Sequence, residues 1–332
     1  ISLKETTKSL ADAALPKIRD YLENLINGFQ SGSNTPPRSR SGDTSNRLAE
    51  QVFSILTSRR FAYLGRQRAI QYRGNILTSL DADIQRGQPL QFFYDIGPGY
   101  HASLFPGIDG LVFTIGLSEL LLLSQANGFI QRVRAIYSPG VNFQFIIDNV
   151  CGLETNDVPL KDTESYCSKL RKLIRELGIR DHVDLLVESE LPHYSTGSKT
   201  VRASFDTPIA PTSTAQKENV ERFLGRHCSE AESAHRIARY QAALQRSEER
   251  LAPFILGVRM TQRATETTFG FRSFPGGDSR IQCGQVALRL STKGRVQPFL
   301  LTSRNVDRYQ CERMRFEEIL PSSIKDVIFA KL

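Results

Sequence analysis

The spacing of apolar residues predicts helices in the first quarter of the chain. Leu10, Ala14, Ile18 and Leu22 recur every four residues, which is typical of one buried helix face, and they predict a helix over 6–29. The same helical spacing predicts a second helix over 45–58. Residues 31–46 contain no apolar side chain and are rich in turn formers and arginine, so a flexible loop or linker is expected between the two helices.

From residue 89 the pattern changes to short apolar runs that alternate with helical stretches. The runs predict strands, and the stretches between them predict helices, with Gly178 ending the second one. The predicted strands are 89–95, 141–148 and 183–188, and the predicted helices are 114–137 and 161–177. Connections long enough to hold a helix favour a parallel sheet.

The remaining third of the chain predicts a long polar loop, more helix and a hairpin. The loop covers 193–219, and helical structure is expected over 221–264, with Ser229 heading its first turn and Pro253 starting a new helix. Further features are a hairpin signal at 275–278 and two strands, 285–290 and 296–301, joined around Lys293 and Gly294.

The predicted fold is therefore α/β: a mostly parallel sheet flanked by helices, with a C-terminal β-hairpin extension. We expect an N-terminal helix and linker over 1–47, a catalytic core over 48–270, and C-terminal strands over 271–332 that complete the core.

Composition narrows the function classes. The chain has 332 residues, is 40% hydrophobic and carries a net charge of +8, which suits anionic partners. No apolar run is long enough to span a membrane, and no signal peptide is visible, so no membrane partner is expected. Five cysteines without a close pair indicate a reducing cytoplasm, and no metal-ligand spacing is present, so neither a metal nor a cofactor is expected.

A basic segment over 58–75 places five arginines beside Phe61, Tyr63 and Tyr72. Arginines interleaved with aromatic rings are typical of a groove for single-stranded nucleic acid. The alternative, which we favour, is a solvated basic face whose aromatic rings pack in the core.

Acidic residues end the predicted parallel strands. Asp95 and Asp148 each follow an apolar run, and Glu188 and Glu190 end the third strand. Ligands of open α/β sheets bind outside the carboxyl ends of the strands. Converging carboxylates there would hold an amine or abstract a proton, whereas the alternative is that they cap helices or face solvent in loops.

The loop after the first strand supplies further candidates. Gly97 and Gly99 allow a ligand to approach the backbone closely, and His101 is the best placed titrating group. The loop matches neither a dinucleotide fingerprint nor a phosphate-binding P-loop. Tyr94, which precedes it, is grouped with the substrate-binding residues.

Three further side chains are candidate site residues. Arg289 lies on a predicted C-terminal strand, where an arginine binds a carboxylate or phosphate or else forms a salt bridge, and Arg259 carries the same alternatives. Cys151 follows Asp148 by three residues, but burial is the favoured interpretation for this thiol.

The order of several segments resembles the isocyanide (isonitrile) synthase family, of the paerucumarin and dityrosine type. The resemblance covers roughly 48–300 and rests on short matches: Gln88–Phe92, Arg132–Gly140, Phe145–Asp148, Asn156–Asp157, Tyr166, Leu170–Ile174, Ala238–Tyr240 and Ala287–Ser291. Members of that family have a Rossmann-like fold and convert the α-amine of an amino acid to an isocyanide, with ribulose 5-phosphate as the carbon donor.

The resemblance also implies site residues. Asp148 matches the acid that ends the second strand, Asp157 the acid of a Ser-Asp pair, and Arg289 the arginine of the C-terminal strand. The chain departs from the family after the first strand, where Tyr94–His101 replaces a segment that contains a lysine. A lysine that could bind the carbonyl or the phosphate of a sugar phosphate is therefore missing from this segment.

The leading hypothesis is an isocyanide-synthase-like enzyme of secondary metabolism. Asp148 would hold or deprotonate the amine, Asp95 and His101 would act as acid/base partners, and Arg289, Tyr94, Asp157, Glu188, Gly97 and Gly99 would bind the substrate. The expected partner is an amino acid, with a sugar phosphate as a second one. The alternatives are an aminoacyl-tRNA-dependent transferase, with tRNA a less favoured partner, and a non-catalytic protein that binds RNA or another partner; the oligomeric state is left open.

Overall fold

A computed structural model describes most of the chain. The described residues are 3–30, 45–63, 70, 72–96, 100–102, 111–113, 115–156, 158–192, 217, 227–259, 270–271, 285–301 and 306–331. Their helices are α1 (Leu3–Gln30), α2 (Ser45–Leu56), α4 (Arg73–Gln85), α5 (Leu117–Arg134), α6 (Asn149–Asn156), α7 (Leu160–Glu176), η2 (Glu188–Glu190), α10 (Glu230–Leu251), η3 (Ala252–Phe254) and η5 (Val306–Arg308). Their strands are β1 (Ala62–Tyr63), β2 (Leu90–Ile96), β3 (Tyr100–Ala102), β4 (Leu111–Phe113), β5 (Val141–Ile147), β6 (Val183–Val187), β7 (Val258–Arg259), β8 (Gly270–Phe271), β9 (Gln285–Leu290), β10 (Val296–Leu301), β11 (Gln310–Met314) and β12 (Val327–Lys331).

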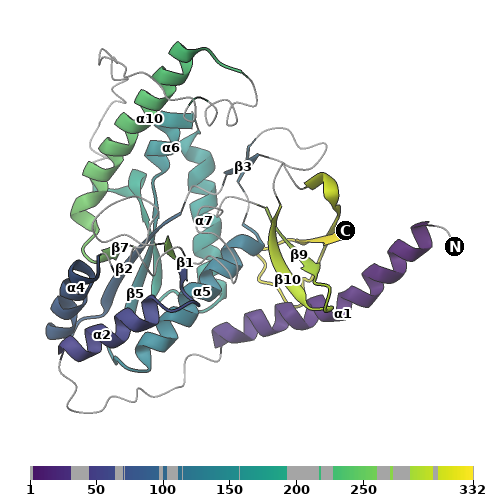
Figure 1. The fold of residues 1–332 in the computed structure, drawn as a ribbon, viewed down its shortest axis with the longest axis horizontal. Helices are drawn as coiled ribbons and strands as arrows, with labels where there is room; N and C mark the ends of the chain where they lie inside the picture. Colours follow the sequence, from purple (N-terminus) through teal and green to yellow (C-terminus); the bar gives the residue numbers. More distant parts are fainter. Residues whose placement is uncertain are drawn as a thin grey trace.

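The main sheet has four strands in the order β6-β5-β2-β7, and all of its strand pairs are parallel (Figure 1). The chain crosses from β2 through α5 to β5 and then through α7 to β6. It returns through α10 to β7 on the other side of β2. The predicted parallel α/β sheet with flanking helices is confirmed.

Helices cover both faces of this sheet, which explains why its strands read as nearly continuous apolar runs. Phe92 and Tyr94 face a large core cluster that also holds buried residues of α1, α2, α4, α5 and α7. Phe93 points to the opposite face, where it packs with Ile146 and with Leu251 of α10.

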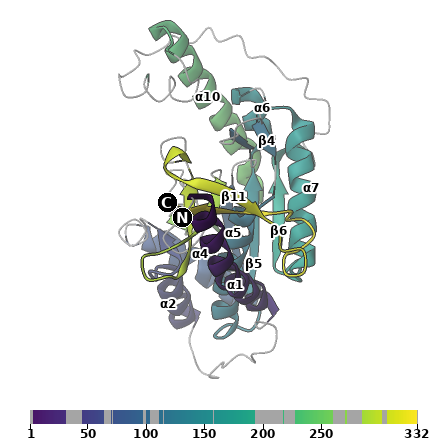
Figure 2. The same ribbon diagram turned by 90° about the vertical axis from the view of Figure 1, so that its right-hand side faces the viewer.

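The C-terminal strands form a second sheet with the order β10-β9-β12-β11. The predicted hairpin is present as the antiparallel pair β9 and β10, and Gly294 in its turn has φ 66°, in the left-handed region. Strand β12 pairs in parallel with β9 and antiparallel with β11. Figures 1 and 2 show α1 alongside this sheet, and Leu288 and Phe329 join the same core cluster as Leu22 of α1. The division at residues 47 and 270 stays a prediction.

One predicted helical segment is partly wrong. Helical structure was expected over 221–264, but among the described residues α10 ends at Leu251, and Pro253 lies in the short 3-10 helix η3. Val258 and Arg259 form β7, which hydrogen-bonds to β2. Pairing with the open side of β2 satisfies backbone groups that a helix at this place would leave unpaired on the strand.

Some predicted segments lie outside the described residues: nearly all of the linker over 31–46, nearly all of the loop over 193–219, and the hairpin signal over 275–278. In the part of the chain that the structure describes, no helix has both the length and the apolar character needed to cross a membrane.

Candidate active site

Three strand-end acids lie along one edge of the main sheet. Asp95 is the next-to-last residue of β2, Asp148 directly follows β5, and Glu188 directly follows β6. Because these strands are parallel and aligned, with Asp95 opposite Ile146 in the register, their carboxyl ends meet at the same edge. The chain leaves β2 to one side and returns to β7 on the other, so β2 and β7 flank the switch point at which ligands bind in doubly wound sheets.

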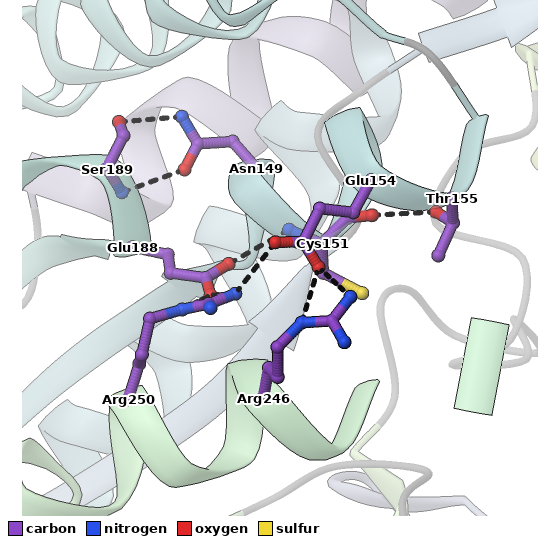
Figure 3. A network of polar contacts seen from close by, with 8 residues as sticks. All are labelled: Asn149, Cys151, Glu154, Thr155, Glu188, Ser189, Arg246 and Arg250. Carbon is purple, nitrogen blue, oxygen red and sulfur yellow. Dashed lines mark hydrogen bonds and ion pairs between the residues drawn. The ribbon is translucent and has the colours of Figure 1, made fainter. Parts of the chain in front are cut away.

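Glu188 is fully buried and held by two donors (Figure 3). Arg250 donates from Nε to Oε1 at 2.6 Å, and the backbone N–H of Cys151 donates to Oε2 at 3.1 Å. Burial raises the pKa of Glu188, and nearby Asp148 raises it further, whereas Arg250 and the Cys151 amide oppose the rise. The carboxylate thus joins the end of β6 to the start of α6 and to α10.

A second carboxylate, Glu154 of α6, pairs with Arg246, which lies one helical turn before Arg250 on α10. Arg246 donates to Glu154 Oε2 from Nη2 at 2.8 Å and from Nε at 3.2 Å, and Arg250 Nη2 lies 3.8 Å from Glu154 Oε1. Figure 3 shows both arginines pointing from α10 toward α6 and the end of β6. Beside them, Asn149 and Ser189 exchange hydrogen bonds of 2.8 and 3.0 Å, which join the ends of β5 and β6.

A third cluster lies at the switch point. Arg259 of β7 donates to Asp95 of β2 from Nε at 3.0 Å and from Nη2 at 2.8 Å. It also donates to Glu248 of α10 from Nη2 at 3.0 Å and from Nη1. Burial lowers the pKa of Arg259, but its two carboxylate partners outweigh that effect and raise it. The guanidinium therefore stays charged between two bidentate carboxylates.

Helix α10 joins these clusters. Arg246 and Arg250 are one helical turn apart and contact α6 and the end of β6, while Glu248 contacts β7. Two neighbouring residues of α10, Ser247 and Leu251, are buried, and Leu251 packs on the main sheet. One helix thus sets cations and an anion against the carboxyl edge of the sheet.

The N-terminus of α5, the first helix after β2, is occupied by a side chain of the protein. Glu119 is 4% exposed, and its Oε2 accepts the Gly116 N–H and the Ser118 hydroxyl, each at 2.8 Å. The Tyr166 hydroxyl donates to Oε1 at 3.3 Å, and burial raises the pKa of this carboxyl. The Glu119 carboxyl group occupies the helix end at which a dinucleotide phosphate binds, which agrees with the missing dinucleotide fingerprint in the sequence.

The other predicted site residues lie in different surroundings. Asp148 is half-buried beside Glu188. Tyr94 is 1% exposed on the opposite sheet face from Asp95, with its ring edge-on to Phe145. Arg289 is in the C-terminal sheet, where its guanidinium lies over Phe299 and Nη1 donates to the Tyr309 hydroxyl at 3.2 Å.

The loop candidates are described only in part. His101 belongs to β3, opposite Val112 of β4, but its side chain lies outside the described residues, as do Gly97, Gly99 and Asp157. Their roles stay predictions. In the described part of the chain, no group of three or more histidine, cysteine or acidic side chains is placed to hold a metal ion.

The basic segment has a structural role where it is described. Phe61 is fully buried, and its ring packs edge-on against Phe129. The guanidiniums of Arg60 and Arg132 lie over the same ring, 5.5 and 5.9 Å from its centroid. Phe61 therefore belongs to the core, as the favoured interpretation predicted, and is not exposed for stacking on a base.

Sequence reasoning missed the arginines and glutamates that surround the strand ends. Arg246, Arg250, Glu154 and Glu248 all lie on helices whose charged residues are indistinguishable from a solvated face in the sequence. Spacing offered one signal, since Arg246 and Arg250 lie on the same helix face as buried Ala243.

The fold and the strand-end residues together define a doubly wound α/β protein with paired acids and arginines at its switch point. No protein-family model matches the chain, and no curated protein matches it. Among solved structures, the chain is similar to PvcA (PA2254) from Pseudomonas aeruginosa, with 15% identity and a TM-score of 0.59. The similarity covers 85% of this chain and 99% of PvcA. The expected resemblance to the isocyanide synthase family is thus confirmed at the level of the fold.

Proposed function

We propose that the protein is an isocyanide-synthase-like enzyme that acts on the α-amine of an amino acid or a derivative. The observation that carries this proposal is the fold shared with PvcA, a paerucumarin isocyanide synthase, over 85% of the chain. Acids and arginines at the strand ends add to it, because an amino acid at neutral pH presents an ammonium group and a carboxylate. Carboxylates suit the first and guanidiniums the second.

Within this proposal, Asp148 holds the amine and accepts its proton, with His101 as its acid/base partner. Asp95 receives a different role from the one expected, because both of its oxygens accept hydrogen bonds from Arg259. With both oxygens bound to the guanidinium, Asp95 fixes the position of Arg259. Arg289 is not assigned to the substrate, because its guanidinium lies over Phe299 in the second sheet.

A sugar phosphate is the proposed carbon donor, although the lysine of the family pattern is missing. A reducing cytoplasm is the proposed location, which fits the described cysteines, since Cys151, Cys167, Cys228 and Cys311 are thiols and not disulfides.

The test is a direct search for the product. Purified protein is incubated with each proteinogenic amino acid and with ribulose 5-phosphate labelled uniformly with carbon-13, and the products are analysed by mass spectrometry. The expected product contains one labelled carbon on nitrogen in place of two hydrogen atoms. Asp148→Asn should lower the rate of product formation by about a hundredfold or more, the usual contribution of a positioned proton acceptor.

Two outcomes contradict different parts of the proposal. A product that lacks the label keeps the amine chemistry and rejects ribulose 5-phosphate as the donor. No mass change with any amino acid, in a preparation that unfolds cooperatively, rejects the proposed activity.

A further inference from the structure

The cluster of Arg259, Asp95 and Glu248 has a feature that a purely structural ion pair does not need. A single buried guanidinium is shared by two carboxylates from two different elements, β2 and α10. One carboxylate would neutralise its charge, and Asp95 alone forms a bidentate pair with it. The edge of the guanidinium that the second carboxylate, Glu248, now binds could therefore bind the carboxylate of a ligand instead.

The two carboxylates are not equally fixed. Asp95 lies in β2, which is paired to β5 and β7 on its two sides, and it takes the Nε and Nη2 edge of Arg259. Glu248 takes the Nη1 and Nη2 edge from a helix, through a longer side chain. The side chain of Glu248 is 30% exposed, compared with 14% for Asp95 and 5% for Arg259. Glu248 is thus the partner that can exchange.

We infer that Arg259 is the anchor for the carboxylate of the amino-acid substrate, and that Glu248 occupies this anchor in the ligand-free protein. The inference rests on the proposed function and deepens it, because it assigns the residue that recognises the carboxylate. It moves that role from Arg289 in the second sheet to an arginine at the switch point between β2 and β7.

Exchange of one carboxylate for another conserves the charge around the guanidinium. The substrate carboxylate would accept the same Nη1 and Nη2 hydrogen bonds that Glu248 accepts now, while Asp95 holds the other edge. No buried charge is left without a partner during this exchange, so desolvation opposes it little. The Glu248 side chain moves into solvent, which it already reaches in part.

The experiment measures binding and needs no carbon donor. Isothermal titration calorimetry is performed with each proteinogenic L-amino acid and with the matching amine that lacks the carboxylate. Glu248→Gln should strengthen amino-acid binding by about tenfold, because a neutral amide competes less well for a guanidinium than a carboxylate does. The affinity for the matching amine should not change.

Arg259→Lys tests the anchor itself. Lysine keeps the positive charge beside Asp95 but loses the planar fork, so the preference for an amino acid over its amine should fall by about tenfold. The matched control is Glu249→Gln, the next residue of α10, which accepts a hydrogen bond from Gln245 on the exposed side of the helix. This control should bind both ligands as the unchanged protein does.

Three outcomes overturn the inference. The first is an unchanged or weaker amino-acid affinity in Glu248→Gln, which should fold because Arg259 keeps its pair with Asp95. The second is an undiminished preference for amino acids in Arg259→Lys, and the third is no binding of any amino acid even by Glu248→Gln. Labelled isocyanide formed by the unchanged protein alongside any of these leaves the proposed function intact and removes only the anchor.

Discussion

At the scale of single residues, burial decides which ion pairs matter for stability. Arg259 is 4% exposed and depends on Asp95 and Glu248 for its hydrogen bonds. The pair of Arg73 with Glu50 joins side chains that are 49% and 39% exposed. Removing one partner of a buried pair leaves an uncompensated charge, whereas an exposed pair is screened by water.

Asp95→Asn should lower the free energy of unfolding by about 2 kcal/mol, because it weakens the charge-assisted hydrogen bonds to a buried guanidinium that Glu248 still neutralises. Glu50→Gln, which weakens the exposed pair, should lower it by less than about 1 kcal/mol. Urea unfolding followed by circular dichroism measures both changes. Equal midpoints for the two variants would show that the Arg259 cluster is solvated in solution.

Glu119 predicts a pH dependence of stability. Burial raises its pKa in the folded state above the unfolded value of about 4.3, so the native protein binds more protons between these two pKa values. Stability should therefore rise as the pH falls through the raised pKa and level off below about pH 4.3. Glu119→Gln lacks this titration, so the unchanged protein should gain stability relative to the variant on acidification.

Urea unfolding of both proteins across this pH range provides the measurement. Other groups whose pKa changes on folding, Glu188 among them, contribute equally to both proteins and cancel in the difference. A difference that is constant with pH would mean that Glu119 is ionised in both states or protonated in both.

The residues of the site show what a sequence can and cannot reveal. Asp148 and Glu188 were found because an acid directly after an apolar strand has a defined place at the sheet edge. Arg246, Arg250 and Glu248 were missed because their partners are separated from them by many residues along the chain. Asp95 was found, but its pairing with Arg259 could not be seen while Arg259 was assigned to a helix.

At the scale of elements, local signals account for most of the correct predictions. Gly178, which directly follows the C-cap residue Leu177 of α7, has φ 69°. At the start of α10, the Ser229 side chain accepts the Glu232 N–H. Both ends were readable because capping depends on neighbouring residues. Helix α4 was not predicted, although Ile76, Leu80 and Ile84 are buried at helical spacing. Its first residues were included in the basic segment 58–75, which was interpreted by its charge and not by its hydrophobic pattern.

At Gly257, the residue before β7, the chain lies too close to β2 to leave room for a side chain. A Cβ added to Gly257 would lie 2.3 Å from the carbonyl oxygen of Gln91 and 2.9 Å from its carbonyl carbon. These are backbone atoms of β2 and cannot rotate away. Glycine is therefore required for β7 to pair beside β2, where Arg259 lies opposite Phe93 and its side chain reaches Asp95.

Gly257→Ala should consequently lower the free energy of unfolding by about 3 kcal/mol and disturb the Arg259 cluster. The matched control is Gly74→Ala in α4, where the added Cβ meets nothing within 4 Å. That variant should gain about 0.5 kcal/mol, because alanine favours a helix over glycine. Urea midpoints compare them, and equal stabilities would contradict the close approach of β7 to β2.

At the scale of the whole molecule, one hydrophobic cluster connects both sheets. Phe143 of the parallel sheet, Leu288 of the C-terminal sheet and Leu22 of α1 all belong to it. The sequence predicted the strands of the hairpin but not this arrangement, because the second sheet depends on β12, which pairs with β9 from far along the chain. Long-range pairing of this kind has no local signal.

The continuous core leads to a prediction about cooperativity. Leu22 is fully buried in α1, and Leu22→Ala should lower the free energy of unfolding by about 3 kcal/mol through lost contacts and the cavity it leaves. Because Leu22 shares its cluster with both sheets, the loss should appear equally in the amide exchange rates of β5 and of β9, measured by hydrogen exchange and mass spectrometry under native conditions. Exchange that accelerates in β9 alone would show that the C-terminal sheet opens as a separate unit, and would support a domain boundary near residue 270. Equal acceleration would show that the chain unfolds as one body, with the switch-point residues fixed by a core that extends well beyond the sheet that carries them.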